Sequence, residues 1–371
     1  MKRGHRLRGW ALLLLGAPSA CGGDAAGSAA AGASGPGGGA TSAGAAGGYE
    51  KGNGEGSAGA GGEGAGGEGA GGEGAGGEGA GAGGEGAGGG PTGECAALLA
   101  GPIEPVRVTD VFSGSEDFAF DGQGHLVARQ GPNLIRLDAT GRTSNFASLR
   151  ESVLGLRVRP DGTLVAALPD RGAVVQISTA GVVSDYVEGL TAPNGLSPDA
   201  EGNVWATETA ADRVIRLGPD GTVSVIASGA PAVSQPDGVL FDPVRRVVFY
   251  TNAAAGEIRR IDAAAPGTAP ALVTTVAGAE LAGLALDACG HLYVVDGKGA
   301  KLYRVRLDRG GAAAGEPELF ASFPTAVANA QFGAGPGFNA KALYVGGAPG
   351  SIYAVTAGIG GAPVPTPPRA P

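Results

Sequence analysis

Short hydrophobic runs recur along the C-terminal three quarters of the chain, each bounded by glycine, aspartate or asparagine. Each run is followed by a second one with interspersed polar residues, such as NLIRLD or EIRRID, and turn sequences such as DGQG and DACG precede several of them. Short runs of this kind between turn signals predict β-strands, and no stretch shows helical periodicity. The six similar runs are HLVAR (125–129), TLVAA (163–167), NVWAT (203–207), VVFYT (247–251), HLYVV (291–295) and ALYVG (342–346).

The spacing of these strands predicts the fold. Equivalent positions recur every 38 to 47 residues, at Asp117, Gly155, Gly195, Gly238, Gly283 and Ala330. A repeat of this length predicts a six-bladed β-propeller of four-stranded blades over residues 95–361. The sixth repeat has no outer strand of its own, because it is followed by a proline-rich tail (362–371) whose prolines lack the backbone donor that strand pairing needs. We therefore expect VRVTDVF, residues 106–112, to complete blade 6 and close the ring.

The first 94 residues have a different composition. Residues 1–20 combine a basic start with an apolar run too short to span a bilayer, which predicts a signal peptide. Cys21 follows a small-residue site, as in bacterial lipoproteins, although Pro18 stands where leucine is usual. Residues 21–94 contain five copies of GGEGA and almost no large apolar side chains, which predicts a disordered tether, and the tail at 362–371 is expected to be disordered too.

Two localisations follow from this N-terminal segment. If Cys21 carries a lipid, the protein is exported and held at the outer membrane or cell surface of a bacterium. If the signal is simply cleaved, the protein is periplasmic or secreted. In either case the compartment is oxidising, so the two remaining cysteines are expected to pair. In the predicted topology Cys95 and Cys289 lie on the same face of adjacent blades, which predicts a disulfide between them.

Charge excludes one class of partner. The net charge is −9, and the predicted propeller contains no block of lysine or arginine. A nucleic-acid interface is therefore not expected. The expected partners are a membrane, through the lipid anchor, and an unidentified small molecule or protein, and we expect the propeller itself to be monomeric.

The candidate chemistry lies where the innermost strands begin, because these residues ring the mouth of a propeller channel. Four of the six positions offer side-chain oxygen, the donor that Ca²⁺ prefers. Two interpretations remain open: a shared metal or ligand site, or simple Asn-Gly and Asp-Gly turns with positive φ. The ring positions are Glu116/Asp117, Leu154, Asn194, Asp237, Ala282 and Asn329.

Several phrases along residues 112–346 resemble one family. SEDFAFD, APNGLSPDAEGNVW, QPDGVLFDPVRRVVFYTN, LAGLALDACGHLYVVDG and ANAQFG are similar to segments of the senescence marker protein/gluconolactonase (regucalcin-like) propellers. Several members are divalent-metal-dependent lactonases. The resemblance implies metal ligands from a glutamate in blade 1, an asparagine in blade 4 and an aspartate in blade 5, with another asparagine in blade 3.

This sequence matches the family's pattern only in part. Glu116 and Asn194 fit the blade 1 and blade 3 positions, and Asp237 replaces the blade 4 asparagine with another oxygen ligand. Ala282 stands where the blade 5 acid is implied, which removes the expected general base for hydrolysis. Asp117 and Asn329 are the remaining candidate ligand contacts.

Three functions follow from this pattern. We expect first an envelope-anchored propeller that recognises a small ligand or protein at its channel face, without turnover. The alternative is a divalent-metal-dependent lactonase or esterase that uses Glu116, Asn194 and Asp237. In both cases one divalent cation, Ca²⁺ before others, is the expected cofactor. A purely structural envelope protein is the third.

Overall fold

The computed structural model describes residues 93–114, 116–347 and 350–362. The predicted signal peptide, the lipidation site Cys21, all but the end of the tether, and nearly all of the tail lie outside these residues. The described part contains no helix that is long and apolar enough to cross a membrane.

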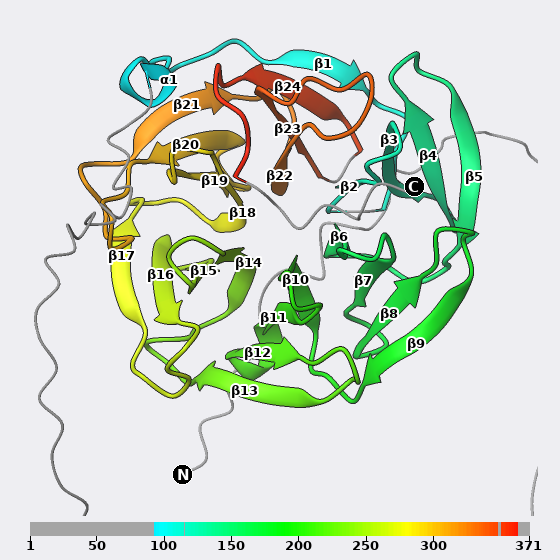
Figure 1. Cartoon of the computed structure of the whole chain (residues 1–371), viewed down its shortest axis with the longest axis horizontal. Coiled ribbons are helices and arrows are strands. Elements are labelled where there is room, and N and C mark those ends of the chain that lie inside the picture. Colours follow the sequence, from blue (N-terminus) through cyan, green and yellow to red (C-terminus); the bar gives the residue numbers. More distant parts are fainter. Residues whose placement is uncertain (1–92, 115, 348–349, 363–371) are drawn as a thin grey trace, which may run out of the picture. The chain divides into compact units, whose positions relative to one another are not determined.

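Within the described residues, 24 strands form six four-stranded antiparallel sheets, arranged as blades around a central axis (Figure 1). This confirms the predicted six-bladed propeller. Blade 1 consists of β2 (Ala119–Phe120), β3 (His125–Gln130), β4 (Asn133–Asp138) and β5 (Thr143–Ser148). Blade 2 consists of β6 (Leu156–Val158), β7 (Leu164–Leu168), β8 (Ala173–Ile177) and β9 (Val183–Glu188). Blade 3 consists of β10 (Pro193–Pro198), β11 (Val204–Glu208), β12 (Arg213–Leu217) and β13 (Val223–Ser228). Blade 4 consists of β14 (Pro236–Asp242), β15 (Val247–Asn252), β16 (Glu257–Asp262) and β17 (Ala271–Thr275). Blade 5 consists of β18 (Leu281–Leu286), β19 (Leu292–Asp296), β20 (Lys301–Val305) and β21 (Glu318–Ser322). Blade 6 consists of β22 (Asn329–Phe332), β23 (Ala342–Gly346), β24 (Ile352–Thr356) and β1 (Val106–Thr109).

The N-terminal strand β1 closes the ring, as predicted. It pairs antiparallel with β24, with Val106 opposite Ala354 and Arg107 opposite Tyr353. The strand ends at Thr109, three residues before the predicted end at 112. The chain leaves the sheet there because Phe112 packs into the hydrophobic cluster between blades 6 and 1, where only 3% of its surface remains exposed.

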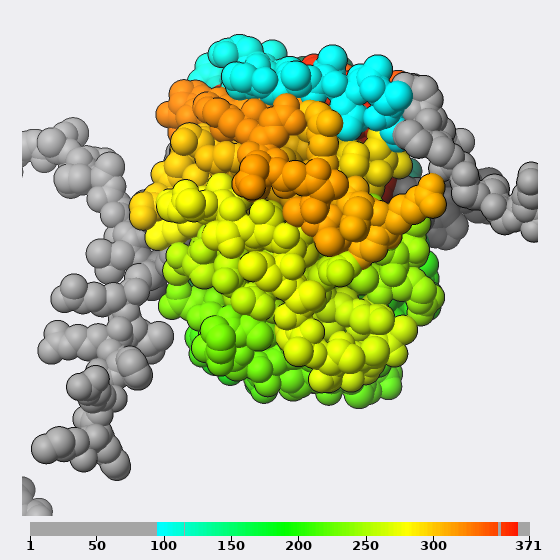
Figure 2. Space-filling model, turned by 90° about the vertical axis from the view of Figure 1, so that its left-hand side faces the viewer, coloured from blue at the N-terminus to red at the C-terminus, as the bar shows by residue number. Residues whose placement is uncertain are grey.

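A disulfide joins Cys95 to Cys289, which confirms the predicted pairing. Cys95 lies in the four-residue helix α1 (Gly93–Ala96), and Cys289 lies in the turn between β18 and β19. The segment after Cys95 continues along the outer strand of blade 5, where the backbone N–H of Ile103 donates to the carbonyl of Phe320 at 2.7 Å. Figure 2 shows this segment in cyan against the orange residues. Blade 5 is thus covered before the chain completes blade 6.

The core lies between the blades rather than inside one sheet. Second strands such as β7, β11 and β19 are buried at every residue. The cluster that joins blades 1 and 2, for example, contains Leu134 of β4 together with Leu164 of β7. Burial on both faces explains why these strands are continuous apolar runs in the sequence. The same packing fixes each innermost strand, and therefore the ring residues, in place.

Candidate functional site

The first strands of blades 3 and 4 carry the same irregularity at the channel mouth. Asn194 and Gly195 together lie opposite the single residue Thr207, because Pro193 pairs with Glu208 and Leu196 with Ala206. Asp237 and Gly238 lie opposite Thr251 in the same way. One extra residue on one strand is a β-bulge, a feature that redirects side chains and is common beside functional sites.

The position of these pairs excludes the turn interpretation of Asn194. Asn194 lies within β10 and Asp237 within β14, and neither they nor the glycines that follow have positive φ. The left-handed residues are instead Ala192 and Gln235, with φ of 50° and 47°, two residues before each ring position. The chain bends at those residues and then enters the strand. The turn interpretation was therefore wrong.

The glycines are needed because neighbouring blades approach closely at the axis. A Cβ atom on Gly195 would lie 2.4 Å from the carbonyl oxygen of Asp237. One on Gly238 would lie 2.2 Å from the carbonyl oxygen of Ala282. Both distances are too short for any side chain. Each glycine thus lets one blade touch the ring residue of the next.

Threonine hydroxyls connect these contacts from blade to blade. Thr207 Oγ1 accepts from the N–H of Gly195 at 2.8 Å and donates to the carbonyl of Asp237 at 2.5 Å. Thr251 Oγ1 does the same between the N–H of Gly238 and the carbonyl of Ala282, at 2.9 and 3.0 Å. The backbone that carries the ring side chains is therefore fixed by hydrogen bonds across blades 3, 4 and 5.

All the predicted oxygen-bearing residues lie at the inner ends of their blades. Asn194, Asp237, Asp117 and Asn329 are buried, and Glu116 is half-buried. The Asn194 amide lies close enough to the Asp237 carboxylate to lower the pKa of that group. The structure thus brings together Asn194 and Asp237, and Glu116 lies close enough to respond to the charge of Asp237.

The two carboxyl groups of Glu116 and Asp237 are unusual in their charge state. Burial first, then the charges of Asp237 and Asp117, raise the pKa of Glu116 to about 8. Burial raises the pKa of Asp237 to about 7, against the opposing hydrogen bond from Asn194, and the charge of Asp117 adds to the rise. Within the described residues, no lysine, arginine or histidine forms an ion pair with either group. Both are acids that lack a compensating positive charge.

Asp117 has a different environment, because Arg157 lies beside it. The Arg157 guanidinium forms an ion pair with the Asp117 carboxylate, and its Nη2 donates to Asn329 Oδ1 at 3.1 Å. Burial raises the pKa of Asp117, while the guanidinium opposes that rise. The Gln331 amide also donates to Asp117, at 3.3 Å. These contacts join blades 6, 1 and 2 across the channel.

Arg157 is the functional candidate that the sequence analysis missed. The repeat predicts Leu154 as the ring residue of blade 2, but the side chain that contacts the ring residues Asp117 and Asn329 belongs to Arg157, three residues later. The signal was present in the repeat: two residues after the ring glycine, the other blades have Ser197, Leu240 and Ala285. Blade 2 thus has a long cationic side chain where these blades have a small or uncharged one, and aligning the repeats shows this difference.

The candidate site offers few oxygen donors to a metal ion. Among the residues that the structure describes, no group of three or more histidines, cysteines, aspartates or glutamates is gathered to hold one. The predicted set Glu116, Asn194 and Asp237 comprises two carboxylates and one amide. It therefore offers hard oxygen donors, but only two of them are anionic groups. A buried and a half-buried carboxylate without a cationic partner fit a divalent cation chemically. Ala282 adds no ligand.

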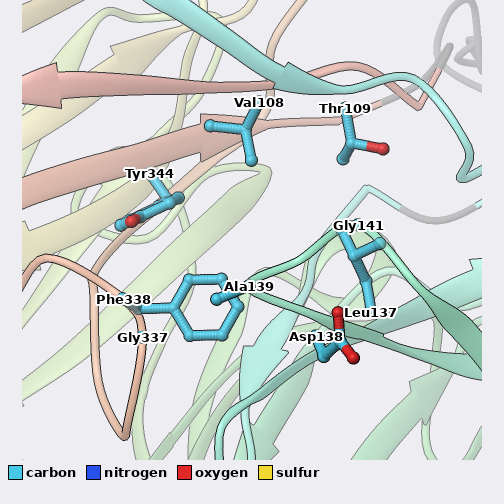
Figure 3. A pocket seen from close by; sticks show the side chains of 9 residues that line it. All are labelled: Val108, Thr109, Leu137, Asp138, Ala139, Gly141, Gly337, Phe338 and Tyr344. Carbon is cyan, nitrogen blue, oxygen red and sulfur yellow. The ribbon is translucent and has the colours of Figure 1, made fainter.

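A pocket elsewhere does not compete with this site. It has a volume of about 140 Å³ and lies where β1 meets blade 1, lined by Val108, Phe338 and Tyr344 among others (Figure 3). Its one carboxylate, Asp138, accepts hydrogen bonds from the backbone and hydroxyl of Thr140 and thereby stabilises a turn. Its polar chemistry is accounted for by the fold.

Comparison with known proteins identifies the family. The family model for the "SMP-30/Gluconolactonase/LRE-like region" matches residues 126–346, more than half of the chain. The chain belongs to this family. Membership in the SMP-30/gluconolactonase family confirms the resemblance inferred from the sequence phrases, and the matched region runs from the second strand of blade 1 to that of blade 6.

Solved structures show the same fold at low identity. A gluconolactonase from Xanthomonas campestris is 19% identical, with a TM-score of 0.55, over 70% of this chain and 99% of its own. The calcium-binding protein regucalcin from Agrobacterium tumefaciens is 15% identical, with a TM-score of 0.56, over 73% and 100%. Virginiamycin B lyase from Staphylococcus aureus is 15% identical, with a TM-score of 0.52, over 69% and 99%. No curated protein matches the chain significantly. Because these neighbours have different functions, the likeness shows the fold alone.

Proposed function

We propose that the channel mouth of this SMP-30/gluconolactonase family propeller binds one divalent cation, Ca²⁺ before others, and with it a small oxygen-bearing ligand, without turnover. Glu116, Asn194 and Asp237 would supply the protein oxygens. The observation that carries the proposal is the pair of neighbouring carboxyl groups, half-buried Glu116 and buried Asp237, with which no cationic side chain of the described residues forms an ion pair. When bound, the cation would supply a positive charge that polarises oxygen groups of the ligand.

Each protein group has a role in this proposal. Glu116 and Asp237 neutralise positive charge at the mouth. Asn194 favours the charged form of the Asp237 carboxylate beside it, and the Thr207 and Thr251 hydroxyls hold the backbone beneath. The calcium-binding description of the Agrobacterium regucalcin supports a cation in a propeller of this family.

The absence of turnover is proposed from Ala282. The family resemblance implies an acid at this position of blade 5, where it would take a proton from water. Ala282 has a methyl group there and is 2% exposed. Hydrolysis would then have to use a carboxylate that the cation also needs.

The second candidate is a metal-dependent lactone or ester hydrolase. The observation that favours it is that Glu116 and Asp237 are neighbours, so that one carboxylate could hold the cation while the other accepts a proton. The gluconolactonase among the structural neighbours supports the same substrate class.

The first experiment is thermal unfolding of the full chain in EDTA and then with Ca²⁺, Mg²⁺, Mn²⁺ or Zn²⁺. A cation at 100 times its Kd should stabilise the fold by about 2.7 kcal/mol. Glu116→Gln and Asp237→Asn should abolish this stabilisation. Glu201→Gln, at an exposed turn, is the matched control and should retain it. If no cation changes the unfolding midpoint of the wild type, both candidate functions are refuted.

A second assay separates the two candidates. Hydrolysis of glucono-δ-lactone is followed by proton release at constant pH, with and without the cation that stabilises the fold. Cation-dependent hydrolysis that Asp237→Asn abolishes would establish the hydrolase. Stabilisation by the cation without any hydrolysis supports binding without turnover.

We also propose that the protein is exported, monomeric and anchored to the envelope through a lipid on Cys21. The Cys95–Cys289 disulfide supports an oxidising compartment. Cell fractionation tests the anchor: the wild type should sediment with membranes, and Cys21→Ser should not. Equal amounts of both in the soluble envelope fraction would contradict the anchor and leave a cleaved signal.

A further inference from the structure

We propose that Arg157 makes the channel select ligands that carry a carboxylate. The inference rests on the proposed function in one respect, because it takes the channel mouth to bind a small ligand. It adds the chemical class of that ligand: a hydroxy acid whose carboxylate binds Arg157 while its other oxygens reach Glu116, Asn194, Asp237 and the cation between them.

The guanidinium of Arg157 is held in a fixed orientation. Nη1 contacts the Asp117 carboxylate and also donates to the carbonyl of Leu156 at 2.8 Å. Nη2 donates to Asn329 Oδ1 at 3.1 Å. Asp117 is itself fixed by the backbone N–H groups of Phe118 and Leu156, at 2.8 and 2.9 Å. A binding group held in this way loses little conformational entropy when a ligand arrives.

One edge of the guanidinium remains open. An arginine has five N–H groups, and the three contacts above use both hydrogens of Nη1 and one of Nη2. The Nε–H and one hydrogen of Nη2, a nitrogen on the same guanidinium plane, have no acceptor among the described residues.

The open edge is accessible. The Arg157 side chain is 15% exposed, and its Nε does not belong to the buried polar atoms that lack a partner. Several other arginines of the propeller differ in this respect, because their Nε atoms are buried without a hydrogen bond: Arg129, Arg159, Arg213 and Arg304. Compared with these four, Arg157 combines an unused Nε with access to the solvent.

The shape and charge of this edge fit a carboxylate. Two parallel N–H groups on a planar cation match the two oxygens of a carboxylate in a bidentate contact. A dianionic phosphate fits less well, because Arg157 is already paired with Asp117, and the charge of Asp117 acts in turn on Glu116 and Asp237. A monoanion on one edge of Arg157 satisfies the donors with the least repulsion.

The test compares two probes that differ in the carboxylate. D-gluconate and the neutral polyol D-glucitol are titrated into the full chain by calorimetry, once in EDTA and once with Ca²⁺. The wild type should bind gluconate more tightly than glucitol by about tenfold or more, the effect expected for charged hydrogen bonds. Arg157→Lys keeps the positive charge beside Asp117 but loses the two parallel N–H groups of the planar guanidinium. The preference for gluconate over glucitol should therefore fall to about threefold or less.

Two controls make the result specific. Arg171→Gln removes an arginine that pairs with Asp185 and Glu188 outside the channel, and it should leave the preference unchanged. If Arg157→Lys does not fold, the double variant Asp117→Asn/Arg157→Gln removes both charges together and should lose the preference as well.

The proposal is overturned if the wild type binds gluconate and glucitol equally, if it binds neither up to about 10 mM, or if Arg157→Lys keeps the full preference. These outcomes are separate from a failure of the cation site. A cation that stabilises the fold without any gluconate preference would leave the proposed cation site standing and refute the role of Arg157. A preference that depends on Arg157, in a protein that no cation stabilises, would establish the carboxylate site and refute the cation site.

Discussion

Gly238 is the most informative single position for the relation between fold and site. Its backbone φ is not left-handed, so alanine is tolerated conformationally, and the effect of Gly238→Ala arises from space alone. The new Cβ would lie 2.2 Å from the carbonyl oxygen of Ala282 and 2.9 Å from Cα of Gly283. Both atoms are backbone of blade 5. The methyl group therefore has to separate blades 4 and 5 at the axis.

The expected loss of stability has two parts. Inserting a methyl group into a packed site that cannot relax typically costs about 1–3 kcal/mol. Separating the blades also strains the hydrogen bond from Thr251 Oγ1 to the Ala282 carbonyl, which contributes about 1 kcal/mol. We expect Gly238→Ala to lower the free energy of unfolding by about 2–4 kcal/mol, which is about 5–15 °C in the unfolding midpoint for a domain of this size.

Urea unfolding in EDTA, followed by circular dichroism, measures this loss. Gly360→Ala is the matched control: Gly360 also lacks positive φ, but its added Cβ would lie 3.6 Å from its nearest neighbour, the carbonyl oxygen of Ala340, an ordinary contact. Gly360→Ala should change stability by less than about 0.5 kcal/mol. If Gly238→Ala is as mild as Gly360→Ala, then the close approach of the blades does not explain the ring glycines.

Two further predictions concern charge and the covalent closure. Because the pKa of Glu116 rises from 4.5 to about 8, the folded protein binds a proton that the unfolded chain releases between these values. In EDTA, stability should therefore fall as pH rises from about 5 to about 8, and Glu116→Gln should flatten that slope; an unchanged slope contradicts the burial of this acid. Cys95→Ser/Cys289→Ser opens a loop of 194 residues and should cost about 2–5 kcal/mol in urea unfolding, whereas a loss below about 0.5 kcal/mol would show that β1 closes the ring unaided.

The sequence predicted the fold well because each repeat shows the same local features, namely an apolar strand and the turn before it. Strand runs buried on both faces, such as HLYVV, and the turns before them recur in every blade, so that errors in one repeat are corrected by the others. The closure by β1 and the Cys95–Cys289 disulfide then followed from topology. The predicted end of the closing strand at 112 was wrong because the burial of Phe112 depends on aromatic residues of another blade.

The site was predicted in position but not in chemistry. The repeat placed Asn194 and Asp237 at the channel, yet an Asn-Gly pair is also the signature of a turn, and only the pairing with Thr207 across the strand distinguishes a bulge from a turn. Arg157 was missed for a related reason. A side chain of that length can reach the ring from a neighbouring position, and its partners Asp117 and Asn329 are 40 and 172 residues away in sequence.

These observations together divide the channel wall into two sectors with different physical properties. Blades 3 to 5 are joined by backbone contacts through glycines and threonine hydroxyls, which leave the side chains of Asn194 and Asp237 unused by the fold. Blades 6, 1 and 2 are joined by side chains, through Asp117 and Arg157. A repeated fold places similar backbone at each position, so its function must come from the positions where the repeats differ. In this propeller the differing residues are two acids without an ion-pair partner among the described residues and one arginine held by Asp117 and Asn329, a set that favours a ligand with both metal-binding oxygens and a negative charge.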